Sequence, residues 1–264
     1  MAAEPALTLD GVTKRFGGLA VCDGIGFSVP AGARMALIGP NGAGKTTLFN
    51  LLSGLYAPRG GRVKFGGADV TGDAPHRLAQ RGLSRTFQNL QIFGRMSAAE
   101  NVMVGRHLHE SHNVFAHLLA LPGVRRQNRE TRQKAEALLE RVGLASLASH
   151  PAGALPYGAL KRLEIARALA TEPRVLLLDE PAAGCNPVEA SELEGIVRGI
   201  ARDGVTVVLV EHNMRLVMNL SDRIHVLANG RTLAEGTATE VRNNPAVIEA
   251  YLGSHAQDAA HAGH

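Results

Sequence analysis

The sequence predicts an α/β fold with a mainly parallel sheet, and three features predict it. Short apolar runs typical of buried strands recur along the chain, at Met35 to Ile38, Val175 to Leu178 and Val205 to Val210. Helical patterns lie between or after them, such as Thr47 to Leu52 and Pro187 to Ile200. The 264 residues are 45% hydrophobic, which is enough to bury a substantial core.

The N-terminal part predicts a second β layer. Residues Leu7 to Val29 and Gly61 to Val70 have the composition of short strands, joined by glycine-rich turns such as Gly17-Gly18 and Gly66-Gly67. We expect these strands to form an antiparallel layer beside the parallel sheet.

The helix predicted at Pro187 to Ile200 has a recognisable start and a buried face. Asn186 is suited to cap it, and Pro187 is tolerated in its first turn. Its apolar residues fall on one stripe, which we expect to face the core. The stripe consists of Leu193, Ile196, Val197 and Ile200.

The stretch from Gly39 to Thr46 follows the first apolar run and precedes a helical pattern, where a phosphate-binding loop belongs. Its glycines allow backbone N–H groups to turn around phosphates in conformations that a Cβ would obstruct. We expect Lys45 to reach the β- and γ-phosphates and the Thr46 hydroxyl to bind Mg²⁺. The sequence therefore predicts that the chain binds a nucleoside triphosphate. The predicted binding residues are Gly39, Pro40, Asn41, Gly42, Ala43, Gly44, Lys45, Thr46 and Thr47.

Polar residues follow three of the strand-like stretches. Asp179 and Glu180 come after one apolar run, and we expect Asp179 to hold Mg²⁺ through water and Glu180 to polarise the attacking water. His212 follows the run that ends at Val210 and is expected to donate a hydrogen bond to the γ-phosphate. Gln88 closes another such stretch and is expected to contact Mg²⁺ and the water. Glu180, His212 and Gln88 are the candidate catalytic residues.

In this order, these features resemble those of the ATPase subunits of ABC transporters, and the resemblance covers nearly the whole chain. It implies a P-loop NTPase fold with a RecA-like core, an antiparallel β subdomain and an inserted α-helical subdomain. The motifs that correspond are Phe16, which would stack on adenine, Gly39 to Thr47 as Walker A, Gln88 in the Q-loop, Leu155 to Ala159 as the signature loop, Asp179 and Glu180 as Walker B, Ala183 to Pro187 as the D-loop, and His212 as the switch histidine.

The resemblance also implies partners. Two ATPase subunits, identical or different, would close on two ATP molecules, each held between the Walker A loop of one subunit and Tyr157, Gly158 and Ala159 of the other. The dimer would act on two membrane permease subunits and, indirectly, a solute-binding protein. Ile92, Phe93 and Met96 are candidate permease contacts, although core packing explains them equally well.

The predicted organisation is a single ATPase domain, 1–253, with a tail at 254–264 that we expect to be disordered. Its core comprises 1–88 and 156–253, and the helical subdomain lies at about 89–155. Within the insert, three segments are predicted to be helical: Ala98 to Leu108, Val114 to Leu121 and Glu130 to Val142.

Particular phrases of the chain resemble the longer-insert ATPase of branched-chain amino acid transporters. They are Arg85 to Asn89, Arg162 to Arg167 after Tyr157-Gly158, Asp179 to Gly184, and Val241 to Gly253. Related ATPases that serve urea or other amide importers look much the same, so the transported solute stays open.

The signature loop departs from the pattern of the family. The general motif reads Leu-Ser-Gly-Gly-Gln, and its serine contacts the γ-phosphate bound by the partner subunit. Here Pro156 takes the place of the serine and has neither a hydroxyl nor a backbone N–H, and Ala159 replaces a polar residue. A slowly hydrolysing, nucleotide-gated regulatory subunit is therefore the second hypothesis.

Charge and composition limit the remaining possibilities. A net charge of +4 with both signs mixed along the chain does not require a nucleic acid partner. The N-terminus lacks a signal-peptide pattern, and no apolar run approaches the roughly 18 residues of a membrane span. We expect a cytoplasmic protein, peripheral on the inner face of the cell membrane. Cys22 and Cys185 are not expected to form a disulfide.

Overall fold

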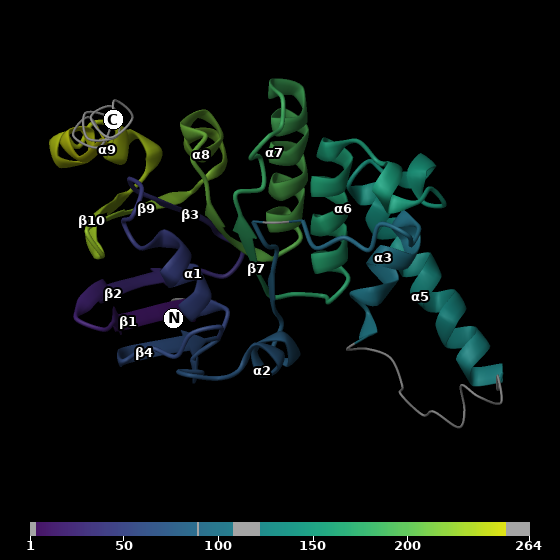
Figure 1. Ribbon diagram of the computed structural model, residues 1–264, viewed down its shortest axis with the longest axis horizontal. Coiled ribbons are helices and arrows are strands. Elements are labelled where there is room, and N and C mark those ends of the chain that lie inside the picture. Colours follow the sequence, from purple (N-terminus) through teal and green to yellow (C-terminus); the bar gives the residue numbers. More distant parts are fainter. Residues whose placement is uncertain (1–3, 89, 108–121, 252–264) are drawn as a thin grey trace.

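Two sheets and a surrounding set of helices make up this computed structural model, which describes residues 4–88, 90–107 and 122–251. The sheets lie toward one end of the molecule and the helices α3, α5 and α6 toward the other, with α7 between (Figure 1). The predicted α/β class is confirmed.

The larger sheet has the strand order β10-β9-β3-β8-β7-β6. All neighbouring pairs are parallel except β9 and β10, which are antiparallel. The carboxyl ends of the parallel strands therefore meet at one edge of the sheet. The strands are β3 (Arg34–Ile38), β6 (Leu83–Arg85), β7 (Val175–Asp179), β8 (Thr206–Val210), β9 (Arg223–Ala228) and β10 (Arg231–Gly236).

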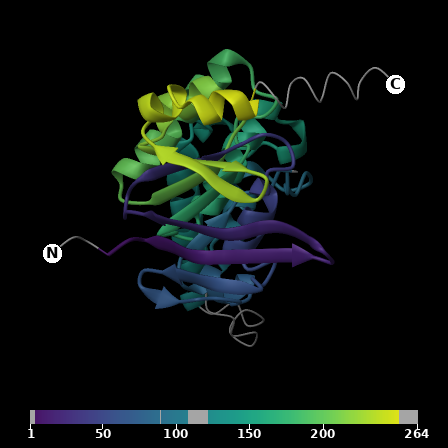
Figure 2. The same ribbon diagram turned by 90° about the vertical axis from the view of Figure 1, so that its left-hand side faces the viewer.

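The smaller sheet is antiparallel, as predicted, with the order β2-β1-β4-β5. Its purple strands lie beside the yellow-green β9–β10 hairpin, where β2 contacts β10 (Figure 2). Helix α1 (Lys45–Leu52) fills the space between the sheets, because Leu48, Phe49 and Leu52 are buried in one cluster with residues of both. The strands are β1 (Leu7–Phe16), β2 (Leu19–Val29), β4 (Gly60–Phe65) and β5 (Ala68–Asp69).

Two of the helices predicted in the insert have different bounds in the structure. Helix α3 (Ala98–Val104) ends before Leu108, and at Gly105 the chain passes so close to α6 that a Cβ there would lie 2.3 Å from the carbonyl oxygen of Arg167. Helix α5 (Pro122–Arg141) begins well before Glu130, since proline is tolerated in a first turn. The helix predicted at Val114 to Leu121 lies outside the described residues, as does the tail 254–264.

The helix predicted at Pro187 to Ile200 follows its pattern more closely. Helix α7 (Pro187–Arg202) has Asn186 as its N-cap, whose side chain accepts hydrogen bonds from Val188 N and Glu189 N. Of its predicted stripe, Ile196 is only partly buried, and the other members are buried. Other helices are α2 (Pro75–Gln80), α6 (Tyr157–Leu169), α8 (Met214–Leu220) and α9 (Ala238–Arg242), and residues 245–251 are also helical.

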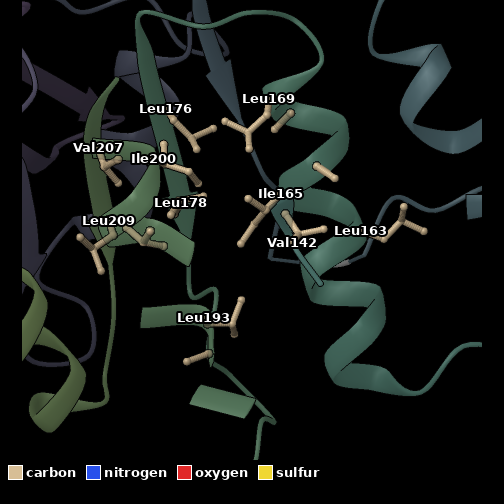
Figure 3. Close-up of a cluster of buried hydrophobic side chains, with 14 of the residues drawn as sticks. Val142, Leu163, Ile165, Leu169, Leu176, Leu178, Leu193, Ile200, Val207 and Leu209 are labelled. Atoms are coloured by element: carbon tan, nitrogen blue, oxygen red, sulfur yellow. The ribbon is translucent and has the colours of Figure 1, made fainter. Parts of the chain in front are cut away.

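One buried cluster joins the helical end of the molecule to the larger sheet. Figure 3 shows side chains of α6 facing those of β7, β8 and α7. Helix α6 also packs on α3 and α5, so it connects the insert to the strands that carry the predicted site. The boundary between the helical subdomain and the second part of the core, at residue 156, stays a prediction. The labelled members are Val142, Leu163, Ile165, Leu169, Leu176, Leu178, Leu193, Ile200, Val207 and Leu209.

Candidate functional site

Segments that follow four neighbouring parallel strands meet at one edge of the larger sheet. The phosphate-binding loop follows β3, Gln88 follows β6, Glu180 follows β7 and His212 follows β8. Together they line a pocket of about 340 Å³. The structure thus brings the predicted loop and the three candidate catalytic residues together. The lining residues are Val21, Asn41, Gly42, Ala43, Gly44, Lys45, Thr46, Thr47, Gln88, Glu180 and His212.

The phosphate-binding loop has room only for glycine at two positions. Gly39 has φ 152° and Gly44 has φ 99°. A Cβ at Gly39 would lie 2.1 Å from the carbonyl oxygen of Leu227, and one at Gly44 would lie 2.5 Å from that of Val21. The loop backbone therefore runs directly against β9 and β2, which leaves its inner side open for an anion.

Lys45 is the buried cation of this pocket, at the first position of α1. Its Nζ donates hydrogen bonds to the carbonyl oxygens of Gly39 (2.7 Å) and Pro40 (2.9 Å). Burial lowers the pKa of Lys45, and the charge of Glu180 opposes that shift. The ammonium group and the N-terminal end of α1 together provide positive potential toward the pocket.

Glu180 is the meeting point of the candidate catalytic residues. Its Oε1 lies 3.0 Å from Nε2 of His212, and its Oε2 lies 3.4 Å from Nε2 of Gln88. Its backbone has φ 48°, a strained conformation for a non-glycine residue. A hydrogen bond from Glu180 N to the carbonyl oxygen of Val210 (3.0 Å) holds that turn against β8.

Asp179 is not among the pocket-lining residues and is paired with Arg85, whose role was not predicted. Its Oδ2 accepts a 2.7 Å hydrogen bond from Arg85, and both side chains are less than a tenth exposed. Arg85 also donates hydrogen bonds to Asn50 Oδ1 in α1 (2.7 Å) and to Oγ of Ser53, the C-cap residue of α1 (2.8 Å). The carboxylate is thereby held between β6, β7 and α1.

Glu211 is a second residue whose role was not predicted. It is buried, and its Oε1 accepts a hydrogen bond from Ala182 N (2.7 Å). Its Oε2 accepts one from His212 N (3.1 Å). This carboxylate ties the turn after Glu180 to the segment that carries His212, which fixes the relative position of those two residues. The sequence did not predict this contact, because an acidic residue after a strand does not by itself indicate its partners.

The predicted adenine-stacking residue Phe16 lies outside the pocket lining, at the end of β1, and is 45% exposed. Its ring makes an edge-on contact with Tyr56, with centroids 5.4 Å apart. Lys14 Nζ lies 5.3 Å from each centroid. Tyr56 was missed because only the fold brings it beside Phe16.

The predicted signature residues Tyr157, Gly158 and Ala159 form the first turn of α6, outside the pocket lining. Pro156 is the N-cap residue, and no side chain caps this helix. A Cβ on Gly158 would lie 2.3 Å from Oε1 of Glu189, so the start of α6 packs tightly against α7. Tyr157 is 46% exposed.

The last described residue reaches back to the phosphate-binding loop. Burial raises the pKa of Tyr251 to about 12, against the opposing effect of a hydrogen bond with the backbone of Gly39. The C-terminal segment therefore contacts the first glycine of the phosphate-binding loop. The phrase containing Tyr251 was noted in the sequence, but nothing there indicated this contact.

The donors at this edge suit both a phosphate chain and Mg²⁺. The glycine cradle and Lys45 are complementary to phosphate oxygens. The hydroxyl of Thr46, the amide of Gln88 and the carboxylate of Asp179 are oxygen donors, the kind that Mg²⁺ prefers. The individual roles of these residues stay predictions.

Further expectations concern the surface and the cysteines. No helix within the described ranges is long and apolar enough to cross a bilayer. Cys22 and Cys185 are both free thiols, as expected. Ile92 packs on the buried cluster, whereas Phe93 is 50% exposed.

Two family models match this chain. The one described as "ABC transporter" matches residues 22–183, and the one described as "Branched-chain amino acid ATP-binding cassette transporter" matches residues 231–257. The second match covers Tyr251, whose contact with the phosphate-binding loop is described above.

Characterised relatives are similar over nearly their full length. The high-affinity branched-chain amino acid transport ATP-binding protein BraF of Pseudomonas aeruginosa is 46% identical over 95% of this chain and 99% of its own. LivG of Escherichia coli K12, which carries the same description, is 42% identical over the same shares. Among solved structures, the ADP conformation of MJ1267, an ATP-binding cassette of an ABC transporter, is 33% identical, with a TM-score of 0.83 over 94% of this chain and 99% of that one.

Proposed function

The chain belongs to the ABC transporter family as an ATP-binding cassette, and we propose that it is the ATP-hydrolysing subunit that powers an importer of branched-chain or closely related amino acids. ATPase activity is typical of such subunits. The observation that carries the catalytic part is the convergence of Gln88, Glu180 and His212 on the pocket of the phosphate-binding loop. The solute class is supported by the relatives and by the C-terminal family match.

The chemistry assigned to these residues is positioning and charge neutralisation. Backbone N–H groups of the loop and Lys45 would hold the β- and γ-phosphates. Mg²⁺, when bound through Thr46 and Gln88 and through water to Asp179, would supply positive charge to the phosphate oxygens. Glu180 would orient and polarise the attacking water, and His212 would donate a hydrogen bond to the γ-phosphate. The 3.0 Å contact between Glu180 and His212 keeps both side chains at the same side of the pocket.

We also propose its partners. Tyr157, Gly158 and Ala159, which lie outside the pocket of their own chain, would contact the nucleotide of a second ATPase subunit. Exposed Phe93 and its neighbours Ile92 and Met96 are the proposed contacts with two membrane permeases, with a solute-binding protein acting through those permeases. The subunit would be peripheral on the cytoplasmic face of the membrane, with no nucleic acid partner.

One observation favours the second hypothesis, slow hydrolysis, at one of the two nucleotide sites that the dimer would form. Pro156 caps α6 without a side-chain hydrogen bond and offers no hydroxyl to the partner's nucleotide. This fits the second hypothesis, in which one site closes on ATP and turns over slowly.

The function is tested by transport. The chain, its partner ATPase, the permeases and the solute-binding protein are reconstituted in vesicles, and ATP-dependent uptake of leucine, isoleucine and valine is compared with that of urea. Uptake of the amino acids supports the proposal. Uptake of urea or an amide alone contradicts the proposed solute class while leaving the ATPase role intact.

A further inference from the structure

Helix α6 carries three charged residues at three-residue spacing, Lys161, Glu164 and Arg167. Positions three apart lie on one side of a helix. Lys161 and Glu164 are each only 3% exposed, and Arg167 is partly buried. The proposed mechanism uses none of them.

Each of the three charges bonds to backbone near the candidate catalytic residues. Lys161 Nζ donates to the carbonyl oxygen of Glu180 at 3.3 Å. Oε1 of Glu164 accepts a hydrogen bond from Phe87 N at 3.1 Å, and its carboxylate accepts another from the backbone of Gln91. Arg167 donates to the carbonyl oxygen of Gln91. The stripe therefore holds the backbone on both sides of Gln88 and the backbone of Glu180 itself.

Packing alone does not explain this stripe. Burial raises the pKa of Glu164, and the Phe87 N–H, the nearby Lys161 and Arg167 charges and the Gln91 N–H act in the opposite direction. A buried charge is costly unless it is paired and hydrogen-bonded, and an apolar residue of similar size packs as well or better. The neighbouring buried positions Leu163 and Ile165 are apolar. The hydrogen bonds of this helix face go to backbone groups near Gln88 and to the backbone of Glu180, and Lys161 Nζ also lies 5.8 Å from the centroid of the Tyr157 ring.

We propose that Lys161, Glu164 and Arg167 are positioning residues that fix Gln88 and Glu180 relative to the start of α6. Since α6 begins at Tyr157, a displacement of that end is transmitted along a rigid helix to both catalytic candidates. The inference rests on the proposed function, because the positions of Gln88 and Glu180 affect hydrolysis only if these two residues are catalytic.

The first test measures the hydrogen bonds directly. Backbone amide exchange of Phe87 and Gln91 is compared in the unmodified full-length chain, Glu164→Ala and Glu164→Gln. Loss of the carboxylate should speed exchange of both amides about fivefold to tenfold, with a smaller effect for Gln, which keeps one oxygen acceptor. The control is Glu192→Ala, which removes the ion pair between Glu192 of α7 and Arg162 of α6. This variant should leave the exchange of both amides unchanged. Unchanged exchange in Glu164→Ala overturns the proposal.

The second test asks whether Glu164 acts through Gln88. Glu164→Ala should lower kcat for ATP about tenfold and change the Kd for ATP less than about twofold, because the phosphate-binding loop and Lys45 are untouched. In a Gln88→Ala background the same substitution should change kcat less than about twofold. An equal loss of kcat in both backgrounds shows an independent structural effect and overturns the proposal.

The two proposals fail in different ways. An unmodified chain that hydrolyses no ATP, alone or with its partners, refutes the proposed function. In that case the amide exchange of Phe87 and Gln91 still decides whether Glu164 holds the loop.

Discussion

Oε1 of Glu180 lies 3.0 Å from Nε2 of His212, although 32 positions separate the two residues in the chain. Each follows the carboxyl end of a parallel strand, β7 and β8, and these strands are neighbours. The contact is therefore a consequence of sheet topology. It places a carboxylate and an imidazole where both reach the pocket of the phosphate-binding loop.

Replacement of Lys45 tests phosphate binding. Lys45→Ala removes the buried cation of the pocket, so the Kd for ATP measured by calorimetry with Mg²⁺ should rise about tenfold to a hundredfold. The fold should survive, because the side chain bonds only to carbonyl oxygens of its own loop. ATP affinity equal to that of the unmodified chain would contradict the assignment.

Restoration of the signature motif tests whether Pro156 and Ala159 slow hydrolysis at the partner subunit's nucleotide. Pro156→Ser with Ala159→Gln should raise turnover at the partner's nucleotide, since a charge-assisted hydrogen bond contributes about 1.5 to 3 kcal/mol. The complex carries Glu180→Gln in this chain, so that hydrolysis reports the partner's site. Equal or lower ATPase activity in the restored version would identify Pro156 as a tolerated variant.

The contact of the C-terminal segment gives a third prediction. Tyr251→Phe removes the hydroxyl that bonds to the backbone of Gly39 and should raise the Kd for ATP about twofold to fivefold. Ile248→Ala is the control, because Ile248 lines a surface pocket together with Tyr251 but is 47% exposed. If both variants bind ATP as the unmodified chain does, Tyr251 has no part in shaping the loop.

Glu172 gives a pH-dependent prediction for stability. Hydrogen bonds from Arg106 and Lys134 lower its pKa from 4.5 to about 2. A lowered carboxyl pKa stabilises the folded state above the unfolded value, and this contribution is lost as the pH falls from about 4.5 to about 2. The effect is small, because the side chain is 52% exposed.

The measurement is urea unfolding of the unmodified chain and Glu172→Gln at several pH values. The unmodified chain should be the more stable near neutral pH, and the difference in unfolding free energy should shrink below about pH 4.5. A difference that grows as the pH falls would show that the ion pairs do not stabilise the fold.

The sequence predicted the elements whose signals are local. Apolar runs identified the strands, and Asn186 marked the start of α7 with the capping contacts that the structure has. The common edge occupied by Gln88, Glu180 and His212 was also predictable, because residues that follow parallel strands meet there.

What the sequence did not reveal depends on contacts between distant elements. Arg85 stands in a phrase that was noted, but its pairing with Asp179 exists only once β6 lies beside β7. Glu164 also stands in a noted phrase, but only the packing of α6 brings it and Lys161 to the backbone of the site. The helix predicted from Glu130 begins at Pro122 in the structure, and proline is tolerated in the first turn of a helix.

The central claim is that Glu180 drives hydrolysis in a pocket that binds ATP. Glu180→Gln keeps the size of the side chain and removes its charge, so ATP binding should persist while a closed dimer accumulates.

The most direct measurement is steady-state ATP hydrolysis by Glu180→Gln beside the Kd for ATP, with Glu192→Gln as the control on a neighbouring helix. We expect turnover to fall about a hundredfold or more with little change in Kd, and the control to match the unmodified chain. Unchanged turnover in Glu180→Gln would remove Glu180 from the mechanism and contradict this account of the site.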